Sequence, residues 1–388
     1  MKILIITHYN FTTKSSGAIN RVLGLAKALS NYASIKVLHQ GPEMVSENLH
    51  FISYTSIFSF NASNWILDAA RPYTSYLIPD FFRAAKGAIG NADVVQVEQP
   101  YLLIPTLMLT RALGKNPLIV LDEHNVDFLS VKSKIGGVST SSLLSIATLP
   151  YIFMSEKLAV KNADLILCVS RVDQELFMRF YDIPRNKLII VPNGVEFDRF
   201  EKALPAKDPL LENDKTIFFH GTLSWYPNLE AVNIIVEYLA PKIPEATFLI
   251  AGANMPLSLV RKIEKTKNVK YLGFLNNLEG WIKSSDVCIA PILRGGGTKL
   301  KVLEYAAAGK PIVATYKAVE GLEMRSGVHG LFYRNVNDKY VEGIKLLLED
   351  DLLVKELGRN AQELAKRYDW NIIGKKLYEF YWFTLDRK

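Results

Sequence analysis

Short β-branched runs alternate with helix-forming segments along the whole chain, and this alternation limits the possible folds more than any other feature. A strand followed by a helix and another strand favours a parallel sheet with helices on its faces. Ligands of open α/β sheets bind at the carboxyl ends of the strands. We therefore expect an α/β protein with two doubly wound domains and a ligand site in the cleft between them. The runs interpreted as strands are Lys2–Thr7, Ile35–His39, Asp93–Glu98, Leu118–Asp122, Asp164–Ser170 and Leu188–Pro192 in the first half, and Thr216–His220, Ala246–Gly252, Val269–Gly273, Asp286–Pro291, Pro311–Thr315 and Gly330–Tyr333 in the second.

The length of the chain also favours two domains. A chain of 388 residues is too long for one ordinary hydrophobic core. The polar, proline-containing stretch 201–214 is interpreted as the linker, which predicts domains at 1–203 and 204–369. The last segment, 370–388, predicts a helix whose many aromatic side chains need burial. This helix packs either on its own domain or on the first one.

The composition excludes several classes of protein. Lys and Arg outnumber Asp and Glu by 46 to 39, which favours acidic small molecules or an anionic membrane surface as partners. Clustered basic stripes are absent from the sequence, so we expect no nucleic-acid partner. The two cysteines, Cys168 and Cys288, lie in apolar strand-like runs and are expected to be buried free thiols.

No run of about 18 apolar residues occurs, so the sequence predicts a cytoplasmic protein that is soluble or peripheral to the inner face of the membrane. The start of the chain, MKILIITHYN, is interpreted as a first strand and not as a signal peptide, because its apolar run is short. The region 61–90 mixes aromatic residues with cations. It is either a peripheral membrane contact or an amphipathic subdomain that packs on the sheet.

The stretch Arg294–Glu304, RGGGTKLKVLE, carries the strongest functional signal. Gly295, Gly296 and Gly297 let the backbone approach a ligand closely, because glycine has no Cβ. Thr298 is predicted to cap the following helix, whose free N–H groups favour a phosphate. Glu304 lies about 9 Å further along the helix axis, within reach of a ribose diol. The pattern indicates a nucleotide-sugar site.

A second glycine turn follows the strand that ends at His220. In FFHGTLSWYPN, the N–H groups of Gly221 and Thr222 are positioned to meet a phosphate, and Pro227 and Asn228 begin a helix. Any strand–helix unit needs such a turn, so the signal gains weight only beside the Arg294–Glu304 stretch.

Together these motifs resemble those of the family-4 glycosyltransferases. The resemblance rests on GTLSWYPN, RGGGTKLKVLEYAAAGKPIVAT, the EGL of Glu320–Leu322, VPNGVEFDRF at 191–200 and DEHNVDF at 122–128, and it covers nearly the whole chain. It implies the GT-B fold, in which two Rossmann-like domains face each other across a cleft, with a C-terminal helix that crosses back to the first domain. It also implies retaining, metal-independent sugar transfer from a nucleotide-diphosphate sugar. The sequence contains no Asp-x-Asp motif, in agreement with a site without metal or other cofactor.

The resemblance assigns roles to single residues. Glu304 matches the glutamate that holds the donor ribose, and His124 matches the histidine that faces the donor sugar. Gly17 matches the glycine of the loop after the first strand, although the start of a helix over 18–29 explains it almost equally well. We therefore predict His124, Lys299 and Glu304 as catalytic residues. The predicted donor-binding set is Gly17, Gly221, Thr222, Arg294, Gly295, Gly296, Gly297, Thr298, Lys299 and Glu304.

Two departures from the family pattern stand out. The family often has two glutamates, of which Glu304 matches the second; the first would lie eight positions earlier, where this chain has Gly296. Many members also carry an arginine and a lysine where this chain has Thr222 and Pro227. We therefore assign the cationic role at the diphosphate to Arg294 and Lys299.

The expected function is that of a hexosyltransferase-type enzyme of polysaccharide biosynthesis, with a nucleotide-sugar donor and a glycan or lipid-linked acceptor. Two alternatives remain open. A nucleotide-sugar epimerase would use acid–base carboxylates such as Glu98 and Glu123. A non-catalytic nucleotide-sugar-binding partner of another transferase would explain the missing first glutamate. A dehydrogenase is disfavoured, because no Gly-x-Gly-x-x-Gly follows the first strand.

Overall fold

The computed structural model describes residues 1–11, 17–46, 48–54, 79–132, 140–208, 211 and 215–387. The chain divides into two compact units, Met1–Pro192 together with Asn371–Lys388, and Asn193–Trp370. This division falls before the expected boundary at 203/204. The reason is that α8 (Phe197–Glu201) buries Phe197 and Phe200 in the core of the second unit.

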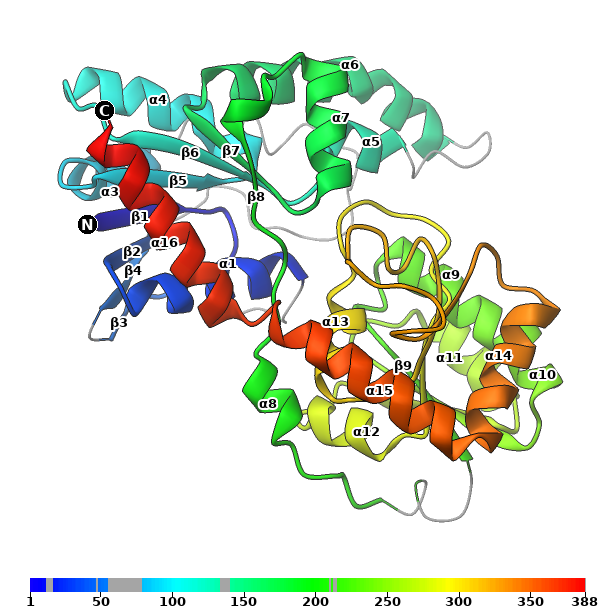
Figure 1. Ribbon diagram of the computed structural model, residues 1–388. Coiled ribbons are helices and arrows are strands. Elements are labelled where there is room, and N and C mark those ends of the chain that lie inside the picture. The colour runs from blue at the N-terminus through cyan, green and yellow to red at the C-terminus, as the bar shows by residue number, and fades with distance from the viewer. Residues whose placement is uncertain are drawn as a thin grey trace. The chain divides into compact units, whose positions relative to one another are not determined.

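An eight-stranded sheet forms the first unit, in the order β3-β4-β2-β1-β5-β6-β7-β8 (Figure 1). All neighbours are parallel except β3 and β4, an edge pair that the sequence analysis missed. β5 and β6 are buried along their whole length, as expected for strands covered on both faces. The strands are β1 Lys2–Ile6, β2 Ser34–His39, β3 Met44–Ser46, β4 Leu49–Ser53, β5 Val94–Glu98, β6 Leu118–Glu123, β7 Leu165–Cys168 and β8 Leu188–Ile190.

Helices connect and cover these strands. They are α1 Gly17–Ser30, α3 Pro79–Ile89, α4 Leu103–Ala112, α5 Asp127–Lys132, α6 Thr140–Asn162 and α7 Arg171–Tyr181, with short 3₁₀ turns η1 Pro100–Leu102 and η2 Arg185–Lys187. The expected helix over 18–29 corresponds to α1. Most of the proposed membrane-contact region, residues 61–78, lies outside the described residues. Among the described residues, no helix is long and apolar enough to cross a membrane.

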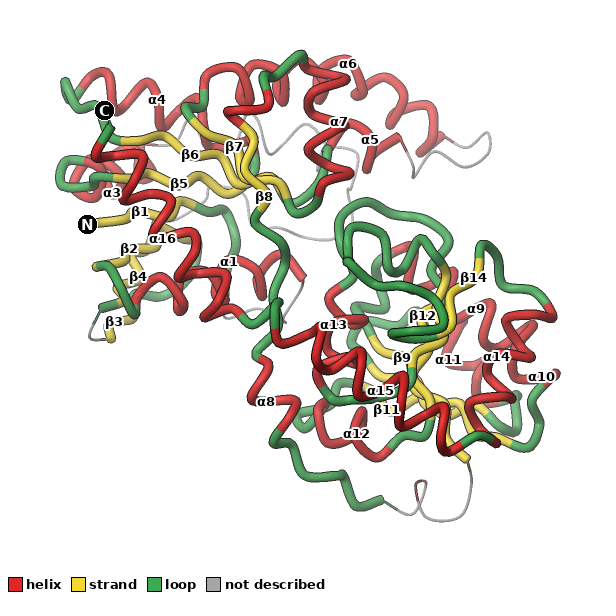
Figure 2. Tube along the Cα trace, in the orientation of Figure 1, coloured by secondary structure: helices red, strands yellow, loops and turns green. Residues whose placement is uncertain are grey.

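The second unit has a six-stranded sheet, whose strands are yellow in Figure 2. The strand order is β11-β10-β9-β12-β13-β14, and every neighbouring pair is parallel. Its strands are β9 Lys215–His220, β10 Ala246–Ala251, β11 Val269–Gly273, β12 Val287–Ala290, β13 Ile312–Thr315 and β14 Leu331–Tyr333. Its helices after α8 are α9 Tyr226–Ile234, the π-helical turn η4 Ile235–Leu239, α10 Ala240–Lys242, α11 Leu257–Glu264, α12 Leu278–Ser284, α13 Leu300–Ala307, α14 Asp338–Glu349 and α15 Asp351–Lys366.

Both sheets are doubly wound, as the sequence predicts. In the second unit the chain runs outward from β9 to β11 and then returns to the other side of β9 with β12. The same reversal occurs between β1 and β5 in the first unit. Such switch points are where ligands of open α/β sheets bind, at the carboxyl ends of the strands. Cys168 and Cys288 are buried free thiols in β7 and β12, as expected.

The last helix, α16 (Trp370–Asp386), packs on the first unit along most of its length. Gly374 lies so close to α1 that an added Cβ would meet the Ala28 Cβ at 2.4 Å. Tyr381 is fully buried, and its hydroxyl donates to Gln96 Oε1 at 2.8 Å. At the other end of the helix, the Trp370 N–H donates to Val195 in the second unit.

Candidate functional site

The switch point of the second sheet brings together the two glycine segments singled out from the sequence. The turn that begins at Gly221 follows β9, and the glycine loop 294–297 follows β12. An added Cβ on Gly295 would lie 3.1 Å from Pro227 Cγ at the start of α9, so the loop packs against that helix. Gly295 and Gly297 have φ of 102° and 63°, which favour glycine.

A glycine is needed at position 221 because there is no room for a side chain, and not because its N–H group binds a ligand. Its N–H donates to the Ala251 carbonyl at 3.1 Å, so it is already used within the sheet and is not offered to a phosphate as expected. An added Cβ would lie 2.7 Å from Asn228 Nδ2 and 2.9 Å from Lys301 Nζ. The Thr222 carbonyl accepts the Asn228 amide at 2.9 Å, which closes the turn onto α9.

The start of α13 differs from the prediction in one detail. Lys299, and not Thr298, occupies the N-cap position, and no side chain caps the helix. The Thr298 hydroxyl instead accepts a hydrogen bond from Asn193 Nδ2 at 2.7 Å. Thr298 therefore bonds to a residue 105 positions away in the sequence. A local sequence pattern cannot predict such a partner.

The two cations assigned to the diphosphate already have partners. Lys299 Nζ donates to the carbonyls of Gly295, Gly296 and Gly297, at 3.3, 2.9 and 2.6 Å. It thereby holds the glycine loop in a closed ring around its ammonium group. Arg294 is half exposed, and its Nε lies 3.4 Å from Glu230 Oε1.

Glu304 lies beside a histidine that the sequence analysis did not select. Its Oε2 is 3.0 Å from Nε2 of His220, the last residue of β9, and both side chains are largely buried. The His220 ring packs edge-on against Tyr305, whose hydroxyl accepts the His220 N–H at 3.2 Å. His220 could have been selected from the sequence, because it is the last residue of a predicted strand. The contact places the Glu304 carboxylate beside the His220 ring at the switch point.

Lys301 is the second residue that the sequence analysis missed. It is 8% exposed, and its Nζ donates to Asn228 Oδ1 at 2.6 Å. The ammonium also lies 4.1 Å from the centre of the Phe219 ring. Burial lowers the pKa of Lys301 to about 7, with Glu304 raising it and Lys299 lowering it.

In the first unit, His124 follows β6 and meets the end of β5. Its Nε2 lies 2.9 Å from Glu98 Oε2, and Glu98 Oε1 accepts the Gln96 amide at 2.7 Å. Since Tyr381 donates to Gln96, a chain of hydrogen bonds runs from α16 to His124. Burial, and then Asp122, raise the pKa of Glu98, whereas the bond to His124 lowers it.

A buried ion pair lies next to this chain. Arg21 on α1 binds Asp122 through Nε at 3.1 and 3.0 Å and through Nη2 at 2.7 Å. Its Nη1 donates to the Pro192 carbonyl at 3.2 Å. Gly17 begins the same helix and is exposed, and residues 12–16 before it lie outside the described residues. The sequence analysis missed the pair because 101 positions separate its members.

Aromatic side chains also lie near His124. The Tyr9 ring lies 6.3 Å from the His124 ring and nearly parallel to it. His8 packs between Tyr9 and Tyr101. Burial, and then the nearby His124, lower the pKa of His8 to about 3, so His8 is neutral.

Oxygen and nitrogen atoms of Glu98, Asp122 and His124 lie within 4.8 Å of one another, close enough to raise the question of a metal ion. However, Asp122 is held by the Arg21 guanidinium, and Glu98 is bonded to Gln96 and His124. A metal ion would meet a fixed positive charge at this place. The donor set therefore does not fit a cation.

Glu123, the other acid considered for an epimerase, points to the opposite face of β6. It is fully buried, and its pKa is raised well above the ordinary value, first by burial and then by Glu156 and Asp127. Glu156 accepts the N–H groups of Asp127 and Phe128 at 2.8 and 3.1 Å and the hydroxyl of Tyr181. This buried acidic cluster closes α5 onto α6 and offers no access for a substrate.

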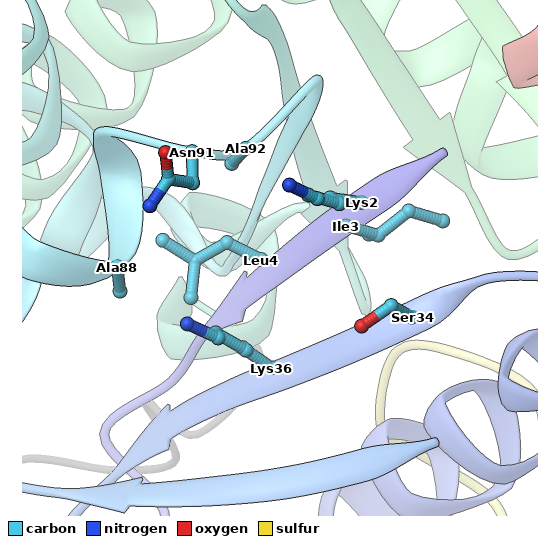
Figure 3. A pocket seen from close by; sticks show the side chains of 8 residues that line it. All are labelled: Lys2, Ile3, Leu4, Ser34, Lys36, Ala88, Asn91 and Ala92. Atoms are coloured by element: carbon cyan, nitrogen blue, oxygen red, sulfur yellow. The ribbon is translucent and has the colours of Figure 1, made fainter.

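A pocket lies at the amino ends of β1 and β2 (Figure 3). Lys2 and Leu4 of β1 and Ser34 and Lys36 of β2 line it, together with residues at the end of α3. Its position at the amino ends of the strands separates it from the switch point.

Two family models match the chain. The Glycosyltransferase Family 4 model matches residues 16–199, and the Glycosyl transferases group 1 model matches residues 214–350. The two matches follow the two units and include His124 in the first and Glu304 in the second.

Curated relatives match at lower coverage. The N,N'-diacetylbacillosaminyl-diphospho-undecaprenol alpha-1,3-N-acetylgalactosaminyltransferase of Campylobacter jejuni is 26% identical over 58% of this chain and 62% of its own length. The UDP-Gal:alpha-D-GlcNAc-diphosphoundecaprenol alpha-1,3-galactosyltransferase of Escherichia coli is 24% identical over 51% of this chain and 54% of its own length. The chain thus spans less than two thirds of these two enzymes.

Solved structures match over nearly the full length. The sucrose-phosphate synthase of Thermosynechococcus elongatus has a TM-score of 0.78 at 16% identity and covers 100% of both chains. The Anabaena protein HepE in complex with UDP has a TM-score of 0.68 at 16% identity and covers 98% of this chain and 99% of its own. These neighbours have the GT-B fold, so the expected fold class is confirmed.

Proposed function

The chain belongs to the family-4 glycosyltransferases, and from this premise we propose that it moves a sugar from a nucleotide-diphosphate sugar to a hydroxyl group of a lipid-linked glycan. The observation that carries the donor part is the arrangement at the switch point of the second sheet. There the closed glycine loop, the start of α13 and the His220–Glu304 pair lie together.

The nucleotide part of the donor follows from the position of Glu304. Its carboxylate lies in the second turn of α13, 3.0 Å from His220 Nε2. A diphosphate at the helix start would then place a ribose diol at this carboxylate. The carboxylate would accept hydrogen bonds from both ribose hydroxyls, an interaction typical of charged acceptors.

We propose that the transfer retains the configuration at the sugar carbon and needs no metal. The sugar–phosphate bond breaks through an oxocarbenium-like state, and the acceptor hydroxyl attacks from the same face. The leaving phosphate oxygen takes the acceptor proton. Stabilisation of the leaving diphosphate by N–H groups and basic side chains supplies the main catalytic effect. His124 keeps the role implied by the resemblance, a contact with the transferred sugar.

The lipid-linked acceptor is proposed from the relatives. Two of them are named for diphospho-undecaprenol-linked saccharides, and another, from Mycolicibacterium smegmatis, is named as a phosphatidyl-myo-inositol mannosyltransferase. These acceptors share a glycan or polyol head on a lipid. A peripheral contact with the inner face of the membrane would follow from such an acceptor.

An epimerase is the weaker candidate, because Glu123 is buried and Glu98 is engaged with Gln96 and His124. A non-catalytic binding partner would keep the nucleotide site and transfer nothing. Gly296 at the position of the first glutamate is its support.

The test begins with nucleoside diphosphates, which raise the melting temperature if they bind the native state. The best nucleotide is then supplied as a set of nucleotide-sugars with undecaprenyl-diphosphate-linked acceptors, with and without EDTA. We expect one donor to give a product with the anomeric configuration of the donor, at an EDTA-independent rate. Conversion of the sugar without acceptor would support the epimerase instead. Binding without any product across the acceptors would favour the non-catalytic partner.

A further inference from the structure

A buried ammonium group lies at the switch point of the second sheet, and no motif in the chain explains it. Lys301 comes from the first turn of α13, yet its side chain is 8% exposed. Burial of a charged group is costly unless the group is paired and bonded. Such a group at a ligand edge of a sheet calls for a functional reason.

The hydrogen bonds of Lys301 do not use all the N–H donors of its ammonium group. Among the residues that the structure describes, its Nζ donates one hydrogen bond, to Asn228 Oδ1. The Phe219 ring covers another side of the ammonium at 4.1 Å. A lysine ammonium has three N–H donors, so two remain for other acceptors.

Gly221 lets the ammonium lie directly against the turn after β9. A Cβ there would lie 2.9 Å from Lys301 Nζ, so the ammonium occupies the place that any larger residue would need. The ammonium therefore lies at the carboxyl end of β9, where a ligand of the sheet is expected.

The other cations of the site are differently engaged. Lys299 is bonded to three carbonyls of its own loop, and Arg294 lies beside Glu230. Both would have to leave these partners to bind a ligand fully. Lys301 keeps its one bond to Asn228 and still has free donors.

We propose that Lys301 binds the donor diphosphate in its protonated form, beside the turn at Gly221. The proposal rests on the nucleotide-sugar function given above and assigns the principal diphosphate cation to a different residue. Asn228 orients the ammonium, and Phe219 shields it from water.

The surroundings make this contact sensitive to pH. The charged groups that act on Lys301 are Glu304 and Lys299 on its own element. On the packed elements, His220 of β9 is paired with Glu304, and Glu230 of α9 is paired with Arg294. Burial lowers the pKa of Lys301 to about 7 in the free protein. A bound phosphate raises it again, so binding above pH 7 takes up a proton.

The test compares the wild type with Lys301→Gln, which keeps a donor for Asn228 but removes the charge. Affinities are measured by calorimetry for the best-binding nucleoside diphosphate, its monophosphate and its nucleoside. We expect the diphosphate affinity to fall about tenfold to a hundredfold, the size of a lost charged hydrogen bond, with the nucleoside affinity unchanged. The wild-type diphosphate affinity should decline as pH rises above 7, while the variant shows no such component. The ligand itself titrates equally in both experiments, so its contribution cancels when the pH dependence of the variant is subtracted from that of the wild type.

Lys310→Gln is the matched control. Lys310 lies near the other end of α13, is partly buried and donates to the Lys283 carbonyl at 3.1 Å. Burial also lowers its pKa, but it faces the amino ends of the strands. This variant should bind all three ligands as the wild type does.

The possible results distinguish a failure of the Lys301 proposal from a failure of the proposed nucleotide-sugar function. If Lys301→Gln weakens the nucleoside and the diphosphate equally, Lys301 only supports the turn and the proposal is wrong. An unchanged diphosphate affinity overturns it too. If the wild type binds no nucleoside diphosphate, the proposed function itself fails. Should Lys301→Gln not fold, calorimetry of the wild type at pH 8 in buffers of different ionisation enthalpy provides the test. Binding of the diphosphate should take up a proton and binding of the nucleoside should not; equal proton uptake for the two ligands would overturn the proposal.

Discussion

In the first unit, the charged groups at the carboxyl edge of the sheet are buried and bonded to one another. In the second unit, the basic groups of the glycine loop lie at the surface and bond to their own loop or to a nearby acid. Arg21 and Asp122 are 1% and 0% exposed, whereas the Arg294 side chain is 49% exposed. The first arrangement is rigid before any ligand arrives, and the second can rearrange.

The difference has a physical origin. A buried ion pair survives only when its geometry is good and its other bonds are satisfied, so it cannot exchange partners cheaply. Surface pairs contribute little and are screened, so a ligand phosphate can replace them. The first unit therefore supplies a fixed support for His124, whereas the basic residues of the glycine loop in the second unit can change partners.

The largest expected effect comes from breaking the buried Arg21–Asp122 ion pair of the first unit. Asp122→Asn leaves the Arg21 guanidinium buried without a counter-charge, and we expect a loss of about 3–5 kcal/mol in the free energy of unfolding. Arg294→Gln, at the exposed pair of the second unit, should change it by less than about 1 kcal/mol. Urea unfolding of both variants measures the contrast, and equal losses would remove the distinction between the units.

Glu304→Gln tests the proposed ribose contact in the second unit. The variant keeps the shape but cannot accept from both ribose hydroxyls as a carboxylate does. We expect kcat/KM to fall about 10²-fold, a few kcal/mol of transition-state stabilisation, while the protein stays folded. Glu363→Gln, an exposed pair partner of Lys366, is the control and should leave kcat/KM unchanged. Normal turnover of Glu304→Gln would contradict the site.

The buried acidic cluster predicts a pH dependence of stability. The pKa of Glu156 is raised to about 8, chiefly by burial, so the folded protein holds a proton that the unfolded chain releases near its ordinary pKa of 4.5. Stability from this proton is therefore full below pH 4.5 and is lost as the pH rises toward 8. The slope is at most about 1.4 kcal/mol per pH unit. Unfolding of Glu156→Gln between pH 5 and 8 should lack this component, and identical slopes would refute the assignment.

The smallest effect is expected for the loop itself. Lys299→Met removes the ammonium that joins three carbonyls of the glycine loop. We expect KM for the donor to rise about tenfold, because the loop loses its closed form before binding, while the free energy of unfolding changes little. Donor titrations with Lys317→Met, a surface lysine paired with Glu320, give the reference. A larger loss of stability than of donor affinity would make Lys299 a structural residue only.

Most of the framework could be predicted from the sequence. The alternating runs predicted the strands of both sheets apart from the edge pair β3 and β4, whose segments of three and five residues are too short to show a clear period. The three glycines correctly marked a turn, because positive φ at Gly295 and Gly297 is a local requirement. Glu304 was placed on the right helix by its spacing from the loop.

The partners of these residues could not be predicted. His220 and Glu304 are 84 positions apart in the sequence, and Gln96 and Tyr381 are 285 apart. Lys301 was not selected from the sequence, because the pattern of a single short helix cannot tell which of its faces α9 and β9 will cover. Thr298 was wrongly expected to cap α13, because its hydroxyl bonds to Asn193.

The sequence by itself determined the alternation of strands and helices, the positions of the glycine turns and the residue types at the strand ends. These depend on backbone preferences and on periods of a few residues. Only the tertiary structure decided which charges are buried, which are paired and which remain available to a ligand. Those properties depend on burial and on distances between residues far apart in the chain, and Lys301 shows the consequence, because only its packing makes it a candidate for the diphosphate.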